Sequence, residues 1–248
     1  MNVIEVSNLK KNFGKFTAVD DISFSVQQGE ILSFLGPNGA GKTTTISMLL
    51  GLLTQKSGTI KIFDKEMPQN RRKILSRVNF SSPYVYMPYG LQVITNLKIF
   101  SNLYSVPNSE KKIEELANIF GVTHLLKRRT MALSSGEVAR VNLLKAFLND
   151  PEILFLDEPT ASLDPEAADT VRNLLLKLKQ ERNLTLFYTS HNMQEVERLS
   201  DRIVFIHRGK IIAEGKPKDV LREHKHNTLE EFFISLARSE EVTKEDAK

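Results

Sequence analysis

The sequence predicts an α/β protein with a mostly parallel sheet, an N-terminal antiparallel β subdomain and an inserted α-helical subdomain. Three observations lead to this prediction. Two alternating runs near the N-terminus are separated only by a short turn, helical periodicity interrupts the pattern between about residues 82 and 150, and strand-like and helix-like runs alternate after it. Such alternation favours an open sheet that binds ligands at the carboxyl ends of its strands.

The first two strands are expected at residues 3–9 and 22–27, with a turn at residues 12–15 between them. Their alternation of apolar and polar residues is typical of a small antiparallel sheet. A further alternating strand is expected at residues 58–63. Between these strands, residues 27–29 form a turn that leads into the apolar run Glu30-Ile31-Leu32-Ser33-Phe34-Leu35.

A glycine-rich loop joins this apolar run to a helix-like run that contains Ile46, Met48 and Leu49. A strand, a glycine-rich loop and a helix N-terminus are the context of a Walker A phosphate loop, in which backbone N–H groups surround the phosphates. Alone, the spacing also fits a glycine-rich turn with a solvated lysine. The predicted nucleotide-binding residues here are Gly36, Pro37, Asn38, Gly39, Ala40, Gly41, Lys42, Thr43 and Thr44. Thr43 is also the predicted hydroxyl ligand of Mg²⁺.

The inserted stretch contains two helical periods, Val93-Leu97-Phe100-Leu103 and Ile113-Leu116-Ile119-Phe120. Beyond it, residues 152–156 read as a fully buried strand. Asp164 is expected to cap the following helix, with Pro165 at its first position, where the missing N–H costs nothing. A strand at 184–188, a helix at 193–199 and a strand at 202–206 complete the alternation.

Two carboxylates follow the buried strand, as in a Walker B motif. We expect Asp157 to hold Mg²⁺, and Glu158 to polarise the attacking water as general base. Taken alone, two acids before Pro159 also fit a helix N-cap.

The tail from Asn227 differs in character from the rest of the chain. Thr228 and Glu231 match a capping box, and Leu229, Phe232, Phe233 and Leu236 share one helical face. We expect this helix to pack on its own domain, with docking to a partner as the alternative. Residues 238–248 carry little apolar surface, which predicts disorder.

Composition excludes several classes of function. The chain has no cysteine and therefore no disulfide or thiolate chemistry, which fits a reducing cytosol. No apolar run approaches the roughly 18 residues of a membrane span, and the N-terminus lacks the features of a secretion signal. The net charge is only +4, with basic and acidic residues mixed, so nucleic acid is not an expected partner.

With both Walker motifs in place, the chain resembles the ATP-binding subunit of an ATP-binding-cassette (ABC) transporter, a P-loop NTPase of exporter-like type. The resemblance covers residues 2 to about 222 and includes the signature Leu133-Ser134-Ser135-Gly136-Glu137 before an apolar-periodic helix. It implies that Ser134, Ser135, Gly136 and Glu137 bind the ATP of a partner cassette, so that two chains enclose two nucleotides. Without the family, the same residues are a cap and a turn.

Other family elements follow in order. Ser162-Leu163-Asp164 resembles the D-loop between the two sites, which adds Asp164 to the expected nucleotide contacts. His191 matches the switch histidine that helps Glu158 to hold the water. Phe13 lies where the family stacks an aromatic ring on adenine, and Val19 is expected to line the same pocket.

Two departures from the family pattern stand out. The run Phe80-Ser81-Ser82-Pro83-Tyr84 has no glutamine where the family has its Q-loop, which puts metal coordination and the link to the membrane subunit in doubt. Ser135 replaces the usual glycine of the signature and is expected to weaken closure of the dimer. Slow hydrolysis is the expected result.

The resemblance implies an ATPase at residues 1–222, followed by a C-terminal helix and a charged, disordered tail at 223–248. ATP and Mg²⁺ are the implied cofactors, and a second cassette and membrane-spanning subunits are the implied partners. Its implied place is peripheral, on the cytoplasmic face of the cell membrane. A soluble ABC ATPase acting on nucleic acid or ribosomes, and a regulatory half of a heterodimer, stay open as alternatives.

Overall fold

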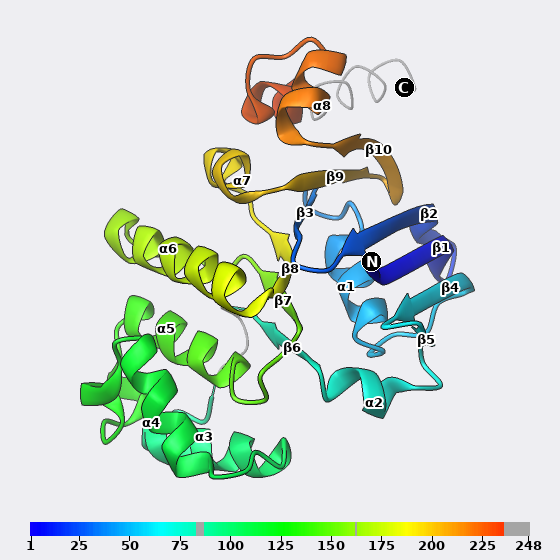
Figure 1. Ribbon diagram of the computed structural model, residues 1–248. Coiled ribbons are helices and arrows are strands. Elements are labelled where there is room, and N and C mark those ends of the chain that lie inside the picture. Colours follow the sequence, from blue (N-terminus) through cyan, green and yellow to red (C-terminus); the bar gives the residue numbers. More distant parts are fainter. Residues whose placement is uncertain (83–86, 162, 236–248) are drawn as a thin grey trace. The chain divides into compact units, whose positions relative to one another are not determined.

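The computed structural model describes residues 1–82, 87–161 and 163–235 (Figure 1). It divides into two compact units, one formed by Met1–Arg71 with Tyr188–Lys248 and the other by Arg72–Phe187. Several sequence predictions fall outside the described residues. They concern Pro83 and Tyr84 of the Q-loop region, Ser162 of the D-loop, Leu236 and the tail at 238–248.

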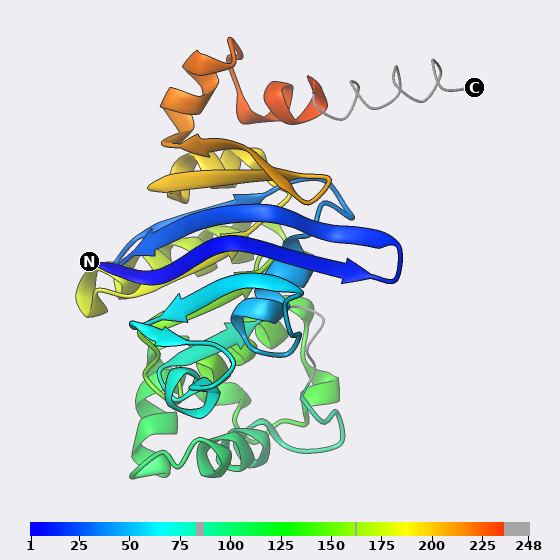
Figure 2. The same cartoon turned by 90° about the vertical axis from the view of Figure 1, so that its right-hand side faces the viewer.

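The first unit contains a four-stranded antiparallel sheet in the order β2-β1-β4-β5. It is formed by β1 (Asn2–Phe13), β2 (Phe16–Gln27), β4 (Ser57–Ile62) and β5 (Lys65–Glu66). β1 and β2 run side by side as a long hairpin (Figure 2). The predicted antiparallel pair is confirmed, but its strands are longer than expected. Register shifts along the pair, one of them between Val6 and Leu9, let pairing continue to Phe13.

The same unit holds the strand that feeds the glycine-rich loop. β3 (Ile31–Leu35) is buried along its whole length and lies parallel to β9 (Arg202–His207), whose other neighbour is the antiparallel β10 (Lys210–Gly215). Its helices are α1 (Lys42–Leu49), α7 (Met193–Leu199) and α8 (Pro217–Glu223). Ile31 N donates to the Asp201 carboxylate at 2.8 Å, so the start of β3 is tied to the turn before β9.

The C-terminal segment packs on this unit. Residues 229–235 are helical, and Glu231 N donates to Thr228 Oγ1 at 3.1 Å, as the capping pattern predicts. Leu229 and Phe232 are buried in a cluster with Val196 and Phe205, and the rings of Phe205 and Phe232 lie 5.1 Å apart. For the described residues, packing on its own domain is therefore confirmed.

The second unit combines a parallel strand pair with helices. β6 (Val78–Ser81) runs parallel to β7 (Ile153–Asp157). Its helices are α3 (Val93–Leu103), α4 (Ser109–Ile119), α5 (Ser135–Ala146) and α6 (Pro165–Arg182), with the 3-10 turns η1 (Thr123–Leu125) and η2 (Thr130–Ala132). Asp164 accepts from Ala167 N at 2.9 Å, and Pro165 is the first helical residue, so the predicted start of α6 is confirmed.

Two elements span the boundary between the units. These are α2 (Arg71–Leu75) and the fully buried β8 (Thr185–Thr189). α3, α4 and α5 all fall between residues 82 and 150, the range expected for the inserted helical subdomain. That this range is a separate insertion within a domain of residues 1–222 stays a prediction.

The predicted helices of the second unit form, but their buried faces differ in part. Val93 and Leu97 are buried on α3, whereas Leu103 is 71% exposed. On α4, Ile113 and Leu116 are buried while Ile119 is 41% exposed. The buried positions of α4 and its C-cap are 113, 116, 117 and 120, which keep the i, i+3, i+4, i+7 spacing that position 119 breaks.

Candidate nucleotide-binding site

The glycine-rich loop lies between β3 and α1, as predicted. An added Cβ at Gly36 would lie 2.1 Å from the carbonyl oxygen of Ile206, and one at Gly41 would lie 2.5 Å from that of Ala18. Both residues also have positive φ angles, 154° and 113°. Because any other side chain would collide with backbone atoms, only glycine fits at these two positions.

The ammonium group of Lys42 is hydrogen-bonded to backbone carbonyl groups of the loop. Lys42 Nζ donates to Gly36 O at 2.6 Å and to Pro37 O at 3.1 Å, and the residue is 7% exposed. The helix N-cap is Gly41, which has no side chain to accept from the N–H groups of the first turn. The loop therefore combines a buried ammonium group with a helix N-terminus that carries no side-chain cap.

The other residues of the loop differ in exposure. Asn38, Gly39 and Thr43 are exposed, Pro37 and Thr44 are half-buried, and Ala40 is buried. An added Cβ at Gly39 would meet no atom within 4 Å. Glycine is therefore favoured at position 39 by the φ of 80° and not by close neighbouring atoms.

Phe13 and Val19 have different surroundings. Phe13, at the end of β1, is 47% exposed, and Lys11 Nζ lies 5.2 Å from the centre of its ring. Val19 is fully buried, with a methyl group 3.4 Å from the place of a Cβ at Gly41. In this structure Val19 supports the phosphate loop, and its expected contact with adenine stays a prediction.

Of the two carboxylates in the second unit, Asp157 ends β7 and Glu158 follows it. Asp157 and Glu158 are both half-buried. Glu158 has a φ of 52°, in the left-handed region, and its carbonyl accepts from Ala161 N at 3.0 Å. For a residue other than glycine this backbone conformation costs on the order of 1–3 kcal/mol, and such strain gathers at functional sites. The backbone conformations of the two acidic residues therefore differ, since Asp157 belongs to a strand and Glu158 is left-handed.

The signature residues form a complete capping box at the start of α5. Ser134 Oγ accepts from Glu137 N at 3.3 Å, and Glu137 Oε2 accepts from Ser134 N at 2.8 Å. Arg128 lies 3.1 Å from the other oxygen of Glu137. The backbone hydrogen bond from Ser134, followed by the nearby charge of Arg128, holds the pKa of Glu137 below its ordinary value. Both oxygens of Glu137 are therefore used within the turn.

The departure at Ser135 causes no local strain. Ser135 is the first residue of α5 and is exposed. At the neighbouring Gly136, an added Cβ would make an ordinary contact of 3.4 Å with Ala167 Cβ. The backbone of this turn therefore accepts a side chain, unlike that of the phosphate loop.

The switch histidine follows β8. His191 is exposed, and the next residue, Asn192, caps α7 by accepting from Glu195 N at 3.1 Å. Sequence reasoning missed the partners of this turn, Ser190 and Glu195, whose side chains hydrogen-bond at 2.9 Å. An Asn followed three residues later by Glu is a capping signal that was available in the sequence.

The predicted site residues are thus distributed over both units. The first unit holds the phosphate loop, Phe13, Val19 and His191, and brings Val19 against Gly41. The second holds Asp157, Glu158, Asp164 and the signature, and brings Ser134 and Glu137 together with Arg128. Their chemistry fits ATP and Mg²⁺: backbone amides and an ammonium group for phosphate, and hard oxygen atoms at Thr43 and Asp157 for the metal.

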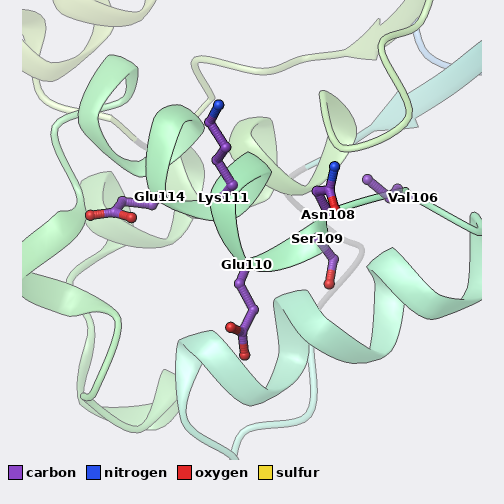
Figure 3. Close-up of a pocket in the computed structure, with 6 residues that line it drawn as sticks. All are labelled: Val106, Asn108, Ser109, Glu110, Lys111 and Glu114. Atoms are coloured by element: carbon purple, nitrogen blue, oxygen red, sulfur yellow. The ribbon is translucent and has the colours of Figure 1, made fainter.

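A separate pocket lies at the start of α4 in the second unit (Figure 3). The residues that line it are Val106, Asn108, Ser109, Glu110, Lys111 and Glu114. Glu110 and Lys111 point to different sides of the helix, and Glu110 is paired with Lys98 at 2.6 Å. None of the predicted nucleotide-binding residues lines this pocket.

In residues 1–82, 87–161 and 163–235, no helix is both long and apolar enough to cross a lipid bilayer.

The loop, the carboxylates at the end of β7 and the capped signature helix define a P-loop nucleotide-binding protein. The sequence profile of the family described as "ABC transporter" matches residues 19–161. The chain belongs to this family.

Relatives and solved structures agree with this assignment. The chain is 38% identical over 228 residues to "Bacitracin transport ATP-binding protein BcrA" of Bacillus licheniformis, covering 92% of this chain and 74% of that protein. It is 34% identical to "Linearmycin resistance ATP-binding protein LnrL" of Bacillus subtilis, covering 94% and 75%. A solved "ATP binding subunit of ABC transporter" superposes with a TM-score of 0.85 at 25% identity, covering 95% and 99%.

The chain is therefore an ATP-binding subunit of an ABC transporter and an ATPase, and its fold is that of an ABC cassette. The family, the fold class, the ATPase activity and ATP binding that the sequence predicted are confirmed.

Proposed function

We propose that this chain hydrolyses ATP in a head-to-tail dimer with a second cassette, at two sites that each join the phosphate loop of one chain to the signature of the other. The phosphate loop carries the proposal, because glycine is obligatory at Gly36 and Gly41 and Lys42 is buried over the loop. The signature supports it, since its residues lie at the exposed N-terminus of α5.

Each predicted site residue has a role in this proposal. Thr43 and Asp157 hold Mg²⁺, which neutralises phosphate charge when bound. Glu158 accepts a proton from the attacking water, and His191 donates a hydrogen bond to the γ-phosphate. Phe13 stacks on adenine and Asp164 links the two sites. The remaining contacts to nucleotide come from residues 36–44 and 134–137, with Val19 beneath the loop.

We further propose that separate membrane-spanning subunits complete the transporter, and that this chain sits peripherally at the cytoplasmic face of the membrane. Export is the direction we propose. The names of similar proteins support it, since they include "Nod factor export ATP-binding protein I" of Ralstonia nicotianae, 34% identical over 221 residues. Stoichiometric recovery of a polytopic membrane protein with the chain, after mild detergent extraction, tests this partner directly.

A regulatory half of a heterodimer is the second candidate. Two departures favour it, the serine at position 135 and the absence of a glutamine in the run at residues 80–84. Because Ser135 is exposed at a helical position without local strain, the signature change alone gives this candidate little support. Turnover that rises when a second, different cassette is added to the chain would favour it over a homodimer.

The decisive test is Glu158→Gln. The amide cannot accept the proton from water, so turnover is expected to fall by at least about a hundredfold, while ATP binding and ATP-dependent dimerisation persist. Phosphate release, equilibrium ATP binding and size-exclusion chromatography measure the three properties.

Glu166→Gln is the matched control, because Glu166 is an exposed acid in the first turn of α6 in the same unit. It is expected to keep full turnover. Turnover that survives Glu158→Gln would refute the role of Glu158 as general base.

A further inference from the structure

We propose that Ser190 and Glu195 are positioning residues that hold His191 in the orientation used for hydrolysis. The inference rests on the proposed role of His191 and adds to it the structural device that fixes the histidine. All the residues involved belong to the first unit.

The Ser190 hydroxyl joins the two sides of His191. It accepts from Asn192 N at 3.0 Å and donates to Glu195 Oε2 at 2.9 Å. Ser190 itself is only 6% exposed. Residues 190 and 192 are thus bonded to each other across His191, so that the exposed histidine lies at the apex of a closed turn.

Glu195 anchors this turn to α7. Its backbone N–H donates to Asn192 Oδ1 at 3.1 Å, while its carboxylate accepts a hydrogen bond from the hydroxyl of Ser190. The residue is 3% exposed. Because burying a carboxylate is costly unless it is hydrogen-bonded, the pair with Ser190 resists separation.

The C-terminal helical segment at residues 229–235 also packs on α7 and holds it in place. Leu229 N donates to Glu197 Oε1 at 2.7 Å, and Leu229 and Phe232 are buried in one cluster with Met193 and Val196 of α7. A shift of α7 would uncover these apolar side chains. The turn that carries His191 is therefore fixed firmly to α7. A group that contacts a transferring phosphate requires such accurate placement.

The test compares ATP turnover by the full chain and its variants. Ser190→Ala removes both hydrogen bonds of the hydroxyl and is expected to lower kcat about tenfold, since misplacement of a reacting group is costly, while KM for ATP stays within about twofold. Ser190→Thr keeps a hydroxyl and is expected to restore most of the turnover. Gln194→Ala, at an exposed position of the same helix, is the control and is expected to leave kcat unchanged.

A double-mutant cycle separates positioning from general destabilisation. If Ser190 acts through His191, adding Ser190→Ala to His191→Ala should cause no further loss of turnover. Independent losses that multiply would overturn the inference. Should Ser190→Ala fail to fold, Glu195→Gln replaces it in the same cycle. The amide oxygen of glutamine takes the place of the carboxylate oxygen that accepts from Ser190, but it carries no charge.

The outcomes also distinguish the two levels of the proposal. Full turnover in His191→Ala would reject the role of His191 in the proposed function, and this inference with it. Loss of turnover in His191→Ala together with full turnover in a folded Ser190→Ala would reject only the inference.

Discussion

The phosphate loop and the signature turn are two helix N-termini of the same chain, and they are built in different ways. At the phosphate loop, neighbouring backbone atoms exclude every side chain from positions 36 and 41. At the signature, two side chains satisfy the helix start, and Gly136 has only an ordinary contact nearby. The first site is determined by close packing, the second by local hydrogen bonds.

Within this chain, a side chain fits at position 135 but not at positions 36 and 41. The serine at position 135 is exposed to solvent at a helical position. A Cβ at position 36, in contrast, would lie 2.1 Å from the carbonyl oxygen of Ile206. Substitutions at the two turns should therefore differ strongly in their effects.

The largest effect is expected for Gly36→Ala. The collision with Ile206 O forces β3 and β9 to shift, so the free energy of unfolding should fall by about 3 kcal/mol and ATP binding should be lost. Denaturant unfolding and equilibrium ATP binding measure both.

Gly39→Ala is the control within the same loop. With no atom within 4 Å and a φ of 80°, it should cost only about 1 kcal/mol of backbone strain. Equal losses at positions 36 and 39 would show that packing does not determine the loop.

An intermediate effect is expected for Ser134→Ala at the signature. Loss of the oxygen that accepts from Glu137 N should lower the free energy of unfolding by about 1 kcal/mol, as for other N-caps. ATP turnover should fall as well if the proposed contact with the partner's nucleotide is correct. Ser135→Ala makes the same chemical change one residue later, where the side chain caps nothing, and should stay within about 0.5 kcal/mol. If the two variants were equally stable, the capping box would have no energetic role.

The smallest effect is a pH dependence at Glu137. Its folded-state pKa lies below the ordinary value of 4.5, so the carboxylate stabilises the fold above about pH 4.5. That contribution is lost as the pH falls through the folded-state pKa. Glu137→Gln should therefore be less stable than the parent chain near neutral pH, and the difference should shrink in acid.

Denaturant unfolding of both proteins at pH 7 and pH 3.5 measures this change. Glu114→Gln, on the exposed surface of α4 in the same unit, provides the comparison for a general loss of one charge. A stability difference between parent and Glu137→Gln that is the same at both pH values would contradict the hydrogen-bonded carboxylate.

Much of the site was predictable because its signals are local. The spacing of Gly36, Gly41 and Lys42 between a strand and a helix marks the phosphate loop, and acids after a buried strand mark Asp157 and Glu158. The caps at Asp164 and Thr228 were equally readable, since a capping side chain and its N–H partner lie within three residues of each other.

The parts that were missed depend on contacts between distant segments. The exposure of Leu103 and Ile119 depends on which neighbours cover α3 and α4, and helical periodicity does not specify these. The burial of Val19 against Gly41 likewise depends on how β2 packs on the phosphate loop.

The amino-acid sequence by itself determined the family, the chemistry and much of the order of strands and helices, since these are encoded in short motifs and in hydrophobic periodicity. Only the tertiary structure decided why Gly36 and Gly41 must be glycine, why position 135 accepts serine and what surrounds His191. Each of these depends on atoms brought together from remote parts of the chain, such as Ile206 against Gly36 and Leu229 against α7. Close packing of such atoms is a property of the fold that no local pattern contains.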